Sequence, residues 1–340
     1  MVTLHATTGT MPDVRLVNAF HRPYENAVAT ARTCYSARGI VRTEDVSPTP
    51  DMAPEAARKR TALRDRIASS IFEAGHHTTL QHAHFQFALS GVSRQFLWTF
   101  LHSHPFYNSE QVSQRYVEVK AERFVLPPLE GEARALFAGR LREQMAEYQA
   151  LIGLLTPVCE AEYFRRFTAR AARPEKYAGQ IQKRAQEVAR YVLPLATEAY
   201  LYHTVSGLTL LRYHRLCRTY DAPREQRLVV EAMVRLLLEV DPLFERLLQE
   251  PLPLEETPEH AFFEAAGLLD GEGAATRDGW AREFDRVLDG RVSRLVDHAA
   301  RGEETLAQAV RDVLAVSPDA LPDDDAIALV LDPAKNTLLG

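Results

Sequence analysis

The sequence has few cysteines and no long hydrophobic run. Its three cysteines, Cys34, Cys159 and Cys217, are widely spaced and form no CxxC pair. This spacing argues against a disulfide scaffold and favours a reduced, cytoplasmic protein. No stretch of about 18 apolar residues is present to span a bilayer, and residues 1–13 lack a basic start followed by an apolar run. We therefore expect a cytoplasmic protein with no membrane partner.

Excess positive charge and the common phosphate loops are also missing. The formal net charge is -6, which argues against a nucleic-acid polymer as partner but is compatible with a local basic pocket for one phosphate. Neither a Walker A nor a GxGxxG sequence occurs, and the absence of GxSxG makes a serine hydrolase a poor fit. The remaining composition, 46% hydrophobic and 25% charged, is that of an ordinary globular protein.

Hydrophobic periodicity predicts an α+β fold. Alternation indicates strands at 14–20 and 85–89, and residues 199–206 are rich in the aromatic and β-branched residues typical of strands. Apolar residues at helical spacing indicate helices at 24–35, 54–74, 93–101 and 130–171, from 180 onward, and at 207–218 and 229–248. We expect the long helix at 130–171 to pack across the sheet, and residues 39–53 to form an exposed insertion. The segment Pro251-Leu252-Pro253 predicts a boundary between a domain at 1–250 and a mainly helical extension at 251–340, with an acidic turn at 318–325.

The run from Ser109 to Tyr116 is unusually dense in polar groups. It contains a carboxylate, two hydroxyls, two amides, a guanidinium and a phenol, and it follows an apolar stretch at 85–101. This order predicts a buried element that leads into a polar loop binding a phosphorylated ligand. Four arginines lie beside apolar segments, where each could bind a phosphate in bidentate fashion or form a structural ion pair: Arg94, Arg115, Arg190 and Arg218.

Six histidines are concentrated between residues 76 and 104. His76, His77, His82 and His84 lie close together, and His102 and His104 follow. A zinc or iron hydrolase is one hypothesis, but no HExxH or similar ligand pattern occurs, so we expect no metal site. Hydrogen-bonding histidines in loops and strands are the favoured interpretation. Cys217, at the end of an apolar segment, is interpreted as packed rather than as a nucleophile.

These segments together resemble the flavin-dependent thymidylate synthases, the ThyX family. The family signature is Arg-His-Arg, a short spacer, then Ser-x-Asn/Ser-Glu/Gln-x-Ser-x-Arg-Tyr, and Ser109-Glu110 with Ser113-Gln114-Arg115-Tyr116 matches its second half. Further blocks at 75–82, 91–94 and 187–194 are similar to the family's Gly-His-x-Thr, Ser-Arg and Ala-Arg-x-Val-Leu-Pro elements. The resemblance covers about residues 14–248.

Several positions depart from the family pattern. His102-Ser103-His104 stands where the family has Arg-His-Arg, one extra residue separates Glu110 from Ser113, and Gln81 replaces a glutamate. Ser206 and Leu208 replace an asparagine and an arginine. Cys217 occupies the position of an arginine that contacts the pyrimidine, and either Cys217 or the neighbouring Arg218 takes that role. An alternative is therefore a catalytically reduced homologue that binds flavin or nucleotide without making dTMP.

The resemblance implies a small twisted sheet packed by long helices, and a homotetramer whose flavin sites combine several subunits. It implies reductive methylation of dUMP to dTMP, with methylenetetrahydrofolate as carbon donor, FAD as cofactor and NADPH as reductant. Carried over position by position, it assigns catalysis to Arg218 and Glu110. It assigns substrate binding to Ser109, Glu110, Ser113, Gln114, Arg115 and Arg190, and FAD binding to His76, Thr78, Gln81, His102, His104 and Ser206.

Overall fold

A computed structural model describes residues 7–8, 12–120, 123–267, 269 and 273–336. The chain divides into two compact units, Met1–Thr257 and Pro258–Gly340, each of which is described by itself. In the described part of the chain, no helix combines the length and the apolar character needed to cross a membrane.

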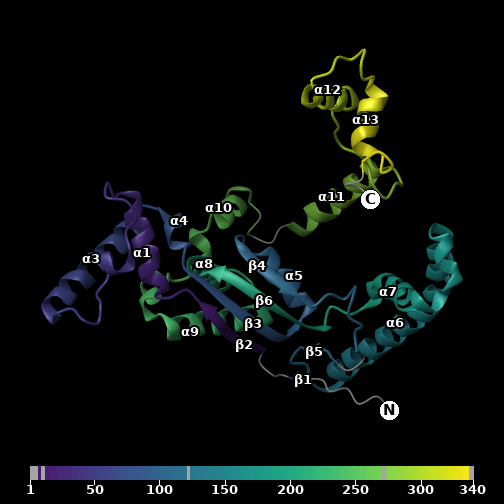
Figure 1. Cartoon of the computed structure of the whole chain (residues 1–340). Coiled ribbons are helices and arrows are strands. Elements are labelled where there is room, and N and C mark those ends of the chain that lie inside the picture. Colours follow the sequence, from purple (N-terminus) through teal and green to yellow (C-terminus); the bar gives the residue numbers. More distant parts are fainter. Residues whose placement is uncertain (1–6, 9–11, 121–122, 268, 270–272, 337–340) are drawn as a thin grey trace. The chain divides into compact units, whose positions relative to one another are not determined.

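An antiparallel sheet of four strands lies at the centre of the first unit (Figure 1), in the order β2 (Asp13–Ala19), β3 (His84–Ser93), β6 (Glu198–Ser206) and β4 (Tyr107–Gln111). Its residues alternate between two faces, as the pleat requires. On one face Phe85, Phe87 and Leu201 are buried, whereas Tyr200 and Tyr202 on the other face are half exposed. The three predicted strands and the predicted α+β fold are confirmed.

Helices cover the buried face. They are α1 (Pro23–Cys34), α3 (Pro54–Glu73), α5 (Arg94–His102), α8 (Gly207–Thr219) and α9 (Arg224–Val240), with the shorter α2 (Thr43–Val46) and α4 (His77–Leu80). Side chains from these helices and from the sheet form one continuous core. Short 3₁₀ helices at Pro242–Leu247 and Leu254–Glu256 follow α9.

Each central strand ends in a serine that caps the following helix. Ser93 Oγ accepts a hydrogen bond from the backbone N–H of Phe96 at 2.9 Å, and Ser206 Oγ accepts one from Thr209 at 3.2 Å. Such caps satisfy donors that the first helical turn leaves unpaired, and the predicted cap at Ser93 is confirmed. Strand and helix are thereby joined without a loop, which fixes where α5 starts relative to the sheet.

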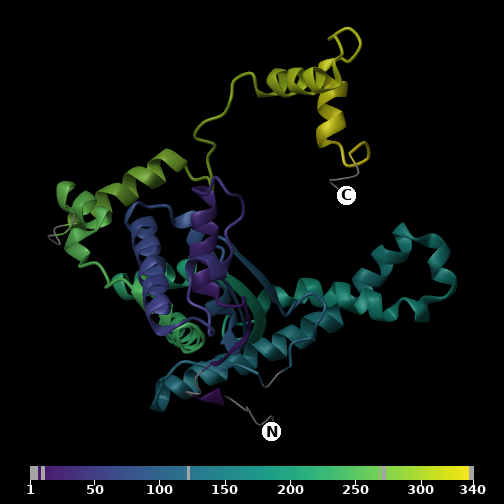
Figure 2. The ribbon, with the colours of Figure 1, turned by 60° about the vertical axis from the view of Figure 1, so that its left-hand side comes forward.

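The long helix does not pack across the sheet. Helix α6 (Gly131–Arg166) runs against α7 (Ala178–Ala189), and Figure 2 shows this hairpin reaching away from the sheet. The apolar face of α6 forms a second core with Phe124, Leu126 and Ala189. Our expectation was wrong because the apolar face of α6 packs against α7 instead. The sequence pattern indicates a helix from residue 180 onward but does not show that it pairs with α6. The hairpin also includes 3₁₀ helices at Thr168–Ala172, Pro174–Lys176 and Arg190–Val192, and β5 (Val125–Leu126) pairs with β1 (Thr7–Thr8) beside it.

Two other sequence expectations need correction. The polar run is not all loop, because Tyr107–Gln111 pairs with β6 as strand β4. A strand at the edge of a sheet can carry polar side chains on both faces, so its sequence shows no hydrophobic alternation. Residues 39–53 are not uniformly exposed either, since Val46 and Ser47 in and after α2 are buried.

The second unit is mainly helical, as predicted, with α10 (Pro258–Ala265), α11 (Gly273–Leu288), α12 (Gly302–Leu314) and α13 (Asp323–Leu331). Buried Arg311 joins α12 to α13 by donating to Leu321 O at 3.0 Å and to Asp323 Oδ1 at 2.7 Å. The acidic residues predicted in a turn at 318–325 instead include the first turn of α13, Asp323 to Asp325. Negative charge is favourable at that end of a helix because of the helix dipole.

Candidate functional site

A cavity of about 790 Å³ lies beside α5 in the first unit. Its lining comes from α5, the end of β4 with the loop that follows, and the segment after α7. The polar and aromatic side chains among the lining residues are Arg94, Gln95, Trp98, His102, Gln111, Gln114, Arg190 and Tyr191. The lining therefore combines cationic, amide and aromatic groups, as expected for a pocket that binds a polar ligand.

Two arginines give this cavity its positive charge. Arg94 Nη1 donates to Gln111 Oε1 at 3.1 Å and to the carbonyl oxygen of Val112 at 3.2 Å. Burial, and then the positive charge of Arg190, lower the pKa of Arg94 from its usual value. Arginine nevertheless stays charged at neutral pH. Two guanidinium groups that repel each other in one cavity favour an anionic ligand there.

A third arginine is linked to Arg190 through the carboxylate and the backbone carbonyl of one glutamate. Arg115, in the loop after β4, forms an ion pair with Glu187 on α7, whose other oxygen accepts from Arg184 Nη1 at 3.0 Å. The carbonyl oxygen of Glu187 also accepts a hydrogen bond from Arg190 Nε at 3.0 Å. Burial acts to raise the pKa of Glu187, but its bonds with the two paired arginines outweigh this effect and lower it. Glu187 thus ties Arg115 and Arg190 to the same turn of the chain.

Strand β4 sends the predicted nucleotide residues to opposite faces of the sheet. Gln111 pairs with buried Leu201, and its side chain reaches Arg94 in the cavity. Glu110 pairs with Tyr202 and belongs to the exposed face. Ser109 Oγ donates to Tyr202 O at 3.2 Å. Ser113, beyond the strand, accepts from the backbone N–H of Arg115 at 3.2 Å. The structure therefore brings Gln114 and Arg190 together, with Arg115 tied to Arg190 through Glu187, and places Glu110 elsewhere.

The two histidines of the His102-Ser103-His104 element also separate. His102 lines the cavity, whereas His104 is buried and its Nε2 lies 3.3 Å from Nε2 of His203 on β6. His104 also stacks on Tyr213, with ring centroids 4.4 Å apart. Burial lowers the pKa of His104 to about 4, and burial with the charge of His104 lowers that of His203 to about 3. Both imidazoles are neutral at pH 7 and belong to the core.

Sequence reasoning did not single out His203. Its position on β6 alternates with the exposed Tyr202 and the half-buried Thr204, so the strand pattern already places it on the buried face. A polar side chain at a buried strand position needs a hydrogen-bond partner. That requirement is the signal from which a histidine pair could have been expected.

The residues expected to bind flavin near α4 lie around a different hollow. His76 lines a cavity of about 450 Å³ together with Arg32, Tyr35 and Arg66, and its Nε2 is 3.3 Å from Tyr35 Oη. Thr78 is exposed and Gln81 half-buried in and after α4. Ser206 is buried as the cap of α8. Within one subunit, then, the predicted flavin residues do not form a single surface.

Cys217 and Arg218 differ in exposure at the end of α8. Cys217 is buried, and burial raises the pKa of its thiol. A buried neutral thiol is unreactive, in agreement with the packed interpretation. The side chain of Arg218 is 43% exposed, and its Nη2 lies 3.9 Å from Glu250 Oε2.

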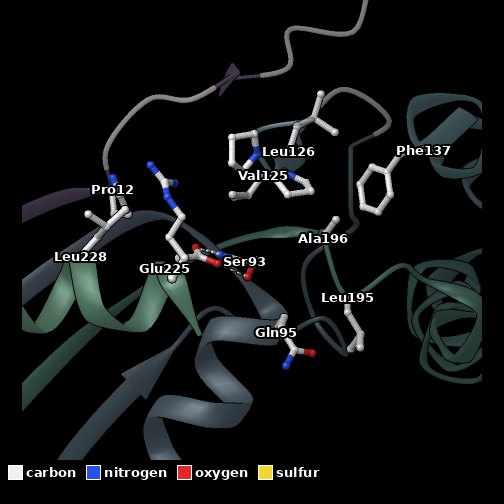
Figure 3. A pocket seen from close by; sticks show the side chains of 13 residues that line it. Pro12, Ser93, Gln95, Val125, Leu126, Phe137, Leu195, Ala196, Glu225 and Leu228 are labelled. Atoms are coloured by element: carbon white, nitrogen blue, oxygen red, sulfur yellow. Dashed lines mark hydrogen bonds between the residues drawn. The ribbon is translucent and has the colours of Figure 1, made fainter. Parts of the chain in front are cut away.

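An apolar cavity of about 360 Å³ adjoins the first one, since Gln95 and Leu195 line both. Figure 3 shows Glu225 bonded to Ser93 at its wall, with Leu126 and Phe137 among the apolar lining. The Ser93 N–H and hydroxyl donate to the two oxygens of Glu225 at 2.7 and 2.5 Å. Burial raises the pKa of Glu225, and the bonds from Ser93 act against this. Glu225 thereby anchors the start of α9 to the start of α5.

Metal ligation can be judged for the residues that the structure describes. Among them, no three or more histidine, cysteine, aspartate or glutamate side chains are grouped so that they could hold a metal ion.

Comparison with known proteins identifies relatives. The family model described as thymidylate synthase complementing protein matches residues 15–243. A flavin-dependent thymidylate synthase of Clostridium tetani is 26% identical over 209 residues, 60% of this chain and 74% of the relative. One from Mycobacterium sp. (strain JLS) is 30% identical over 186 residues, 54% of this chain and 69% of the relative. The solved structure of Helicobacter pylori ThyX complexed with FAD and dUMP aligns with a TM-score of 0.45 at 19% identity, covering 70% of this chain and all of that one.

Proposed function

The chain belongs to the thymidylate synthase complementing protein family, and from this premise we propose that it is an FAD-dependent thymidylate synthase. The proposed reaction is reductive methylation of dUMP to dTMP, with methylenetetrahydrofolate as carbon donor and NADPH as reductant. The observation that supports it most is the group of three arginines: Arg94 and Arg190 line one cavity, and Glu187 ties Arg115 to Arg190. The phosphate of a nucleoside monophosphate is a dianion, the kind of group that clustered arginines bind.

On the substrate side, Arg115 and Arg190 would hold the phosphate of dUMP, with Ser113 and Gln114 as further donors. Ser113 already orders the loop by accepting from the backbone of Arg115. Glu110 belongs to the exposed face of the sheet, together with Tyr202. We propose that it reaches the nucleotide of a neighbouring subunit in a homotetramer, and that Ser109 supports the strand from which it projects.

The residues present fit FAD in part. The cavity beside α5 that Arg94 and Arg190 line, called the arginine cavity from here on, has cations next to the aromatic side chains of Trp98 and His102. This combination suits a ligand with a flat ring and a diphosphate. We propose that His102 contacts the cofactor there, and that His76, Thr78 and Gln81 contact it from another subunit. His104 and Ser206 are enclosed in the core of their own subunit, so we assign them structural roles.

When bound, FAD supplies the hydride chemistry between NADPH and the one-carbon unit. The chain's own residues bind and orient the nucleotide. Arg115 and Arg190 fix the phosphate end, and Arg218, whose guanidinium is half exposed, is proposed to contact the pyrimidine in place of the packed Cys217. The substrates are free cellular metabolites, and we propose a cytoplasmic enzyme.

Binding of the two ligands to purified protein tests this function. We expect flavin absorbance to co-purify or to be restored by added FAD, and calorimetry to show binding of dUMP. Arg190→Ala should weaken the binding of dUMP. Arg286→Ala, which removes an exposed arginine paired with Glu283 in the second unit, should leave dUMP binding unchanged. Protein that binds neither FAD nor dUMP would contradict the proposal.

A further inference from the structure

An exposed tryptophan lies on the wall of the arginine cavity. Trp98 lines that cavity and is 65% exposed, although tryptophan is on average strongly buried in folded proteins. The buried face of α5 consists of Phe96, Leu97 and Phe100, which pack into the core. Trp98 is therefore not a core residue, and it lines two hollows: the arginine cavity and a smaller one of about 250 Å³ beside the end of α8.

The position of this ring is fixed by the helix and by a histidine. Trp98 and His102 lie one helical turn apart, with ring centroids separated by 4.2 Å and planes inclined by 35°. The Nδ1 atom of His102 lies 2.6 Å from the carbonyl oxygen of Trp98. Because α5 is capped at Ser93 and buried along its other face, the pair forms a preorganised aromatic surface.

Charge and shape together indicate the kind of ligand that this surface would take. Arg94 and Arg190 supply positive charge in the same cavity, and the Arg190 guanidinium lies 5.5 Å from the ring centroid of Tyr191, which is 80% exposed. Exposed aromatic rings among cations favour a flat heteroaromatic ring that carries anionic groups. Stacking grows with overlap area, so a fused three-ring system covers the indole more fully than a pyrimidine does.

We propose that Trp98, held by His102, is the stacking platform for the isoalloxazine ring of the flavin in the arginine cavity. This inference rests on the proposed function and specifies which residue of this chain would contact the flat face of the cofactor. The arginines would then face the phosphate groups of ligands in the same cavity.

The chain offers a matched control. It contains two tryptophans, Trp98 and Trp280. Both are 65% exposed, and Trp280 also has a ring one helical turn later, Phe284, with centroids 5.2 Å apart. The variants Trp280→Phe and Trp98→Phe therefore each retain one comparable tryptophan, whose emission can be followed without overlap from the other.

The experiment is a titration of both variants with FAD, with dUMP as a parallel arm. After correction for absorbance, we expect FAD to quench Trp98 emission in Trp280→Phe more strongly than it quenches Trp280 emission in Trp98→Phe. Trp98→Leu should weaken FAD binding by about 5- to 100-fold, the usual range for losing an aromatic stacking partner. Trp98→Phe should retain most of the affinity, and Trp280→Leu all of it.

The outcomes separate this inference from the proposed function. FAD binding that leaves Trp98 emission and the affinity of Trp98→Leu unchanged overturns the stacking role alone. A response to dUMP but not to FAD also overturns it, because the ring on Trp98 is then the nucleobase. If Trp98→Leu keeps its FAD affinity but changes its elution volume in gel filtration, Trp98 is a subunit contact and the inference fails. Wild-type protein that binds neither ligand contradicts both proposals.

Discussion

Arg115 and Glu187 form an ion pair that joins the loop after β4 to helix α7. The same glutamate accepts from Arg190 through its backbone carbonyl and from Arg184 through its second carboxylate oxygen. Two arginines that the sequence places far apart are thus tied to one residue. Arg115 and Arg190 are therefore both held at the end of α7, where we propose that they bind the phosphate of dUMP.

Removal of the Arg115 guanidinium should weaken dUMP binding. We expect Arg115→Ala to cost about 1.5–3 kcal/mol, the range for a hydrogen bond to a charged group, which corresponds to about ten- to a hundredfold in Kd. Calorimetry with dUMP and with deoxyuridine measures the effect, which should be much smaller for the nucleoside because it lacks the phosphate. Arg165→Ala, which removes an exposed arginine paired with Glu162, is the control. Equal losses for nucleotide and nucleoside would remove Arg115 from the phosphate site.

Glu187 should assist dUMP binding although it is negatively charged. If its main effect were repulsion of the phosphate, Glu187→Gln would tighten binding; if it positions Arg115, the same change should weaken binding by about 1 kcal/mol or more. The effect should vanish when Arg115 is already alanine, as a double-mutant cycle would show. Glu162→Gln is a matched control, because Glu162 also bridges two arginines, Arg165 and Arg166. Tighter binding in Glu187→Gln would show that the glutamate competes with the ligand.

The His104 and His203 pair should make the first unit sensitive to acid. Burial depresses the pKa of both histidines below 6.5, to about 4 and about 3, so the unfolded chain binds more protons than the folded one below pH 6.5. Stability contributed by the neutral pair is present above that pH and is lost as the pH falls through this range. The expected slope is up to about 1.4 kcal/mol per pH unit for each histidine.

Urea unfolding at several pH values between 7.5 and 5 measures this slope. Followed by tryptophan emission in Trp280→Phe, it reports on the unit that contains Trp98. His203→Phe should flatten the dependence, whereas His298→Ala, which removes an exposed histidine of the second unit, should not. An unchanged slope in His203→Phe would show that the acid sensitivity has another origin.

The thiol of Cys217 should be inert. It is buried and its pKa is raised, whereas Cys34 is exposed. A thiol reagent added to native protein should therefore modify Cys34 quickly and Cys217 only on unfolding, as peptide mass mapping would show. Cys217→Ser should keep most of the dTMP-forming activity. Complete loss of activity with an intact fold would indicate a chemical role for the thiol.

The sequence predicts the strands and the family because their signals are local. Alternation identifies β3, aromatic and β-branched residues indicate β6, Ser93 identifies the start of α5, and ordered motif blocks identify the family. The packing of α6 is not predictable in this way. An amphipathic helix shows that it has an apolar face but does not show what covers that face, which here is α7.

The candidate site is predictable in its residue types but not in its geometry. The family resemblance assigns Gln114, Arg115 and Arg190 to one site, and the structure places them around Glu187 and the arginine cavity. The pairing of Glu110 with an exposed residue depends on the register of β4, which only the neighbouring strand fixes. The burial of the His104 side chain likewise depends on a contact distant in sequence, with His203 on β6.

Formation of dTMP is the most direct test of the central claim. Purified protein is incubated with dUMP, FAD, NADPH and methylenetetrahydrofolate, and the nucleotides are separated and identified by mass. We predict dTMP formation that requires dUMP, NADPH and methylenetetrahydrofolate, and also added FAD where none co-purifies. Its rate should fall sharply in Arg115→Ala but not in Arg165→Ala. Binding of FAD and dUMP without any dTMP under these conditions would contradict the claim that this chain is a thymidylate synthase.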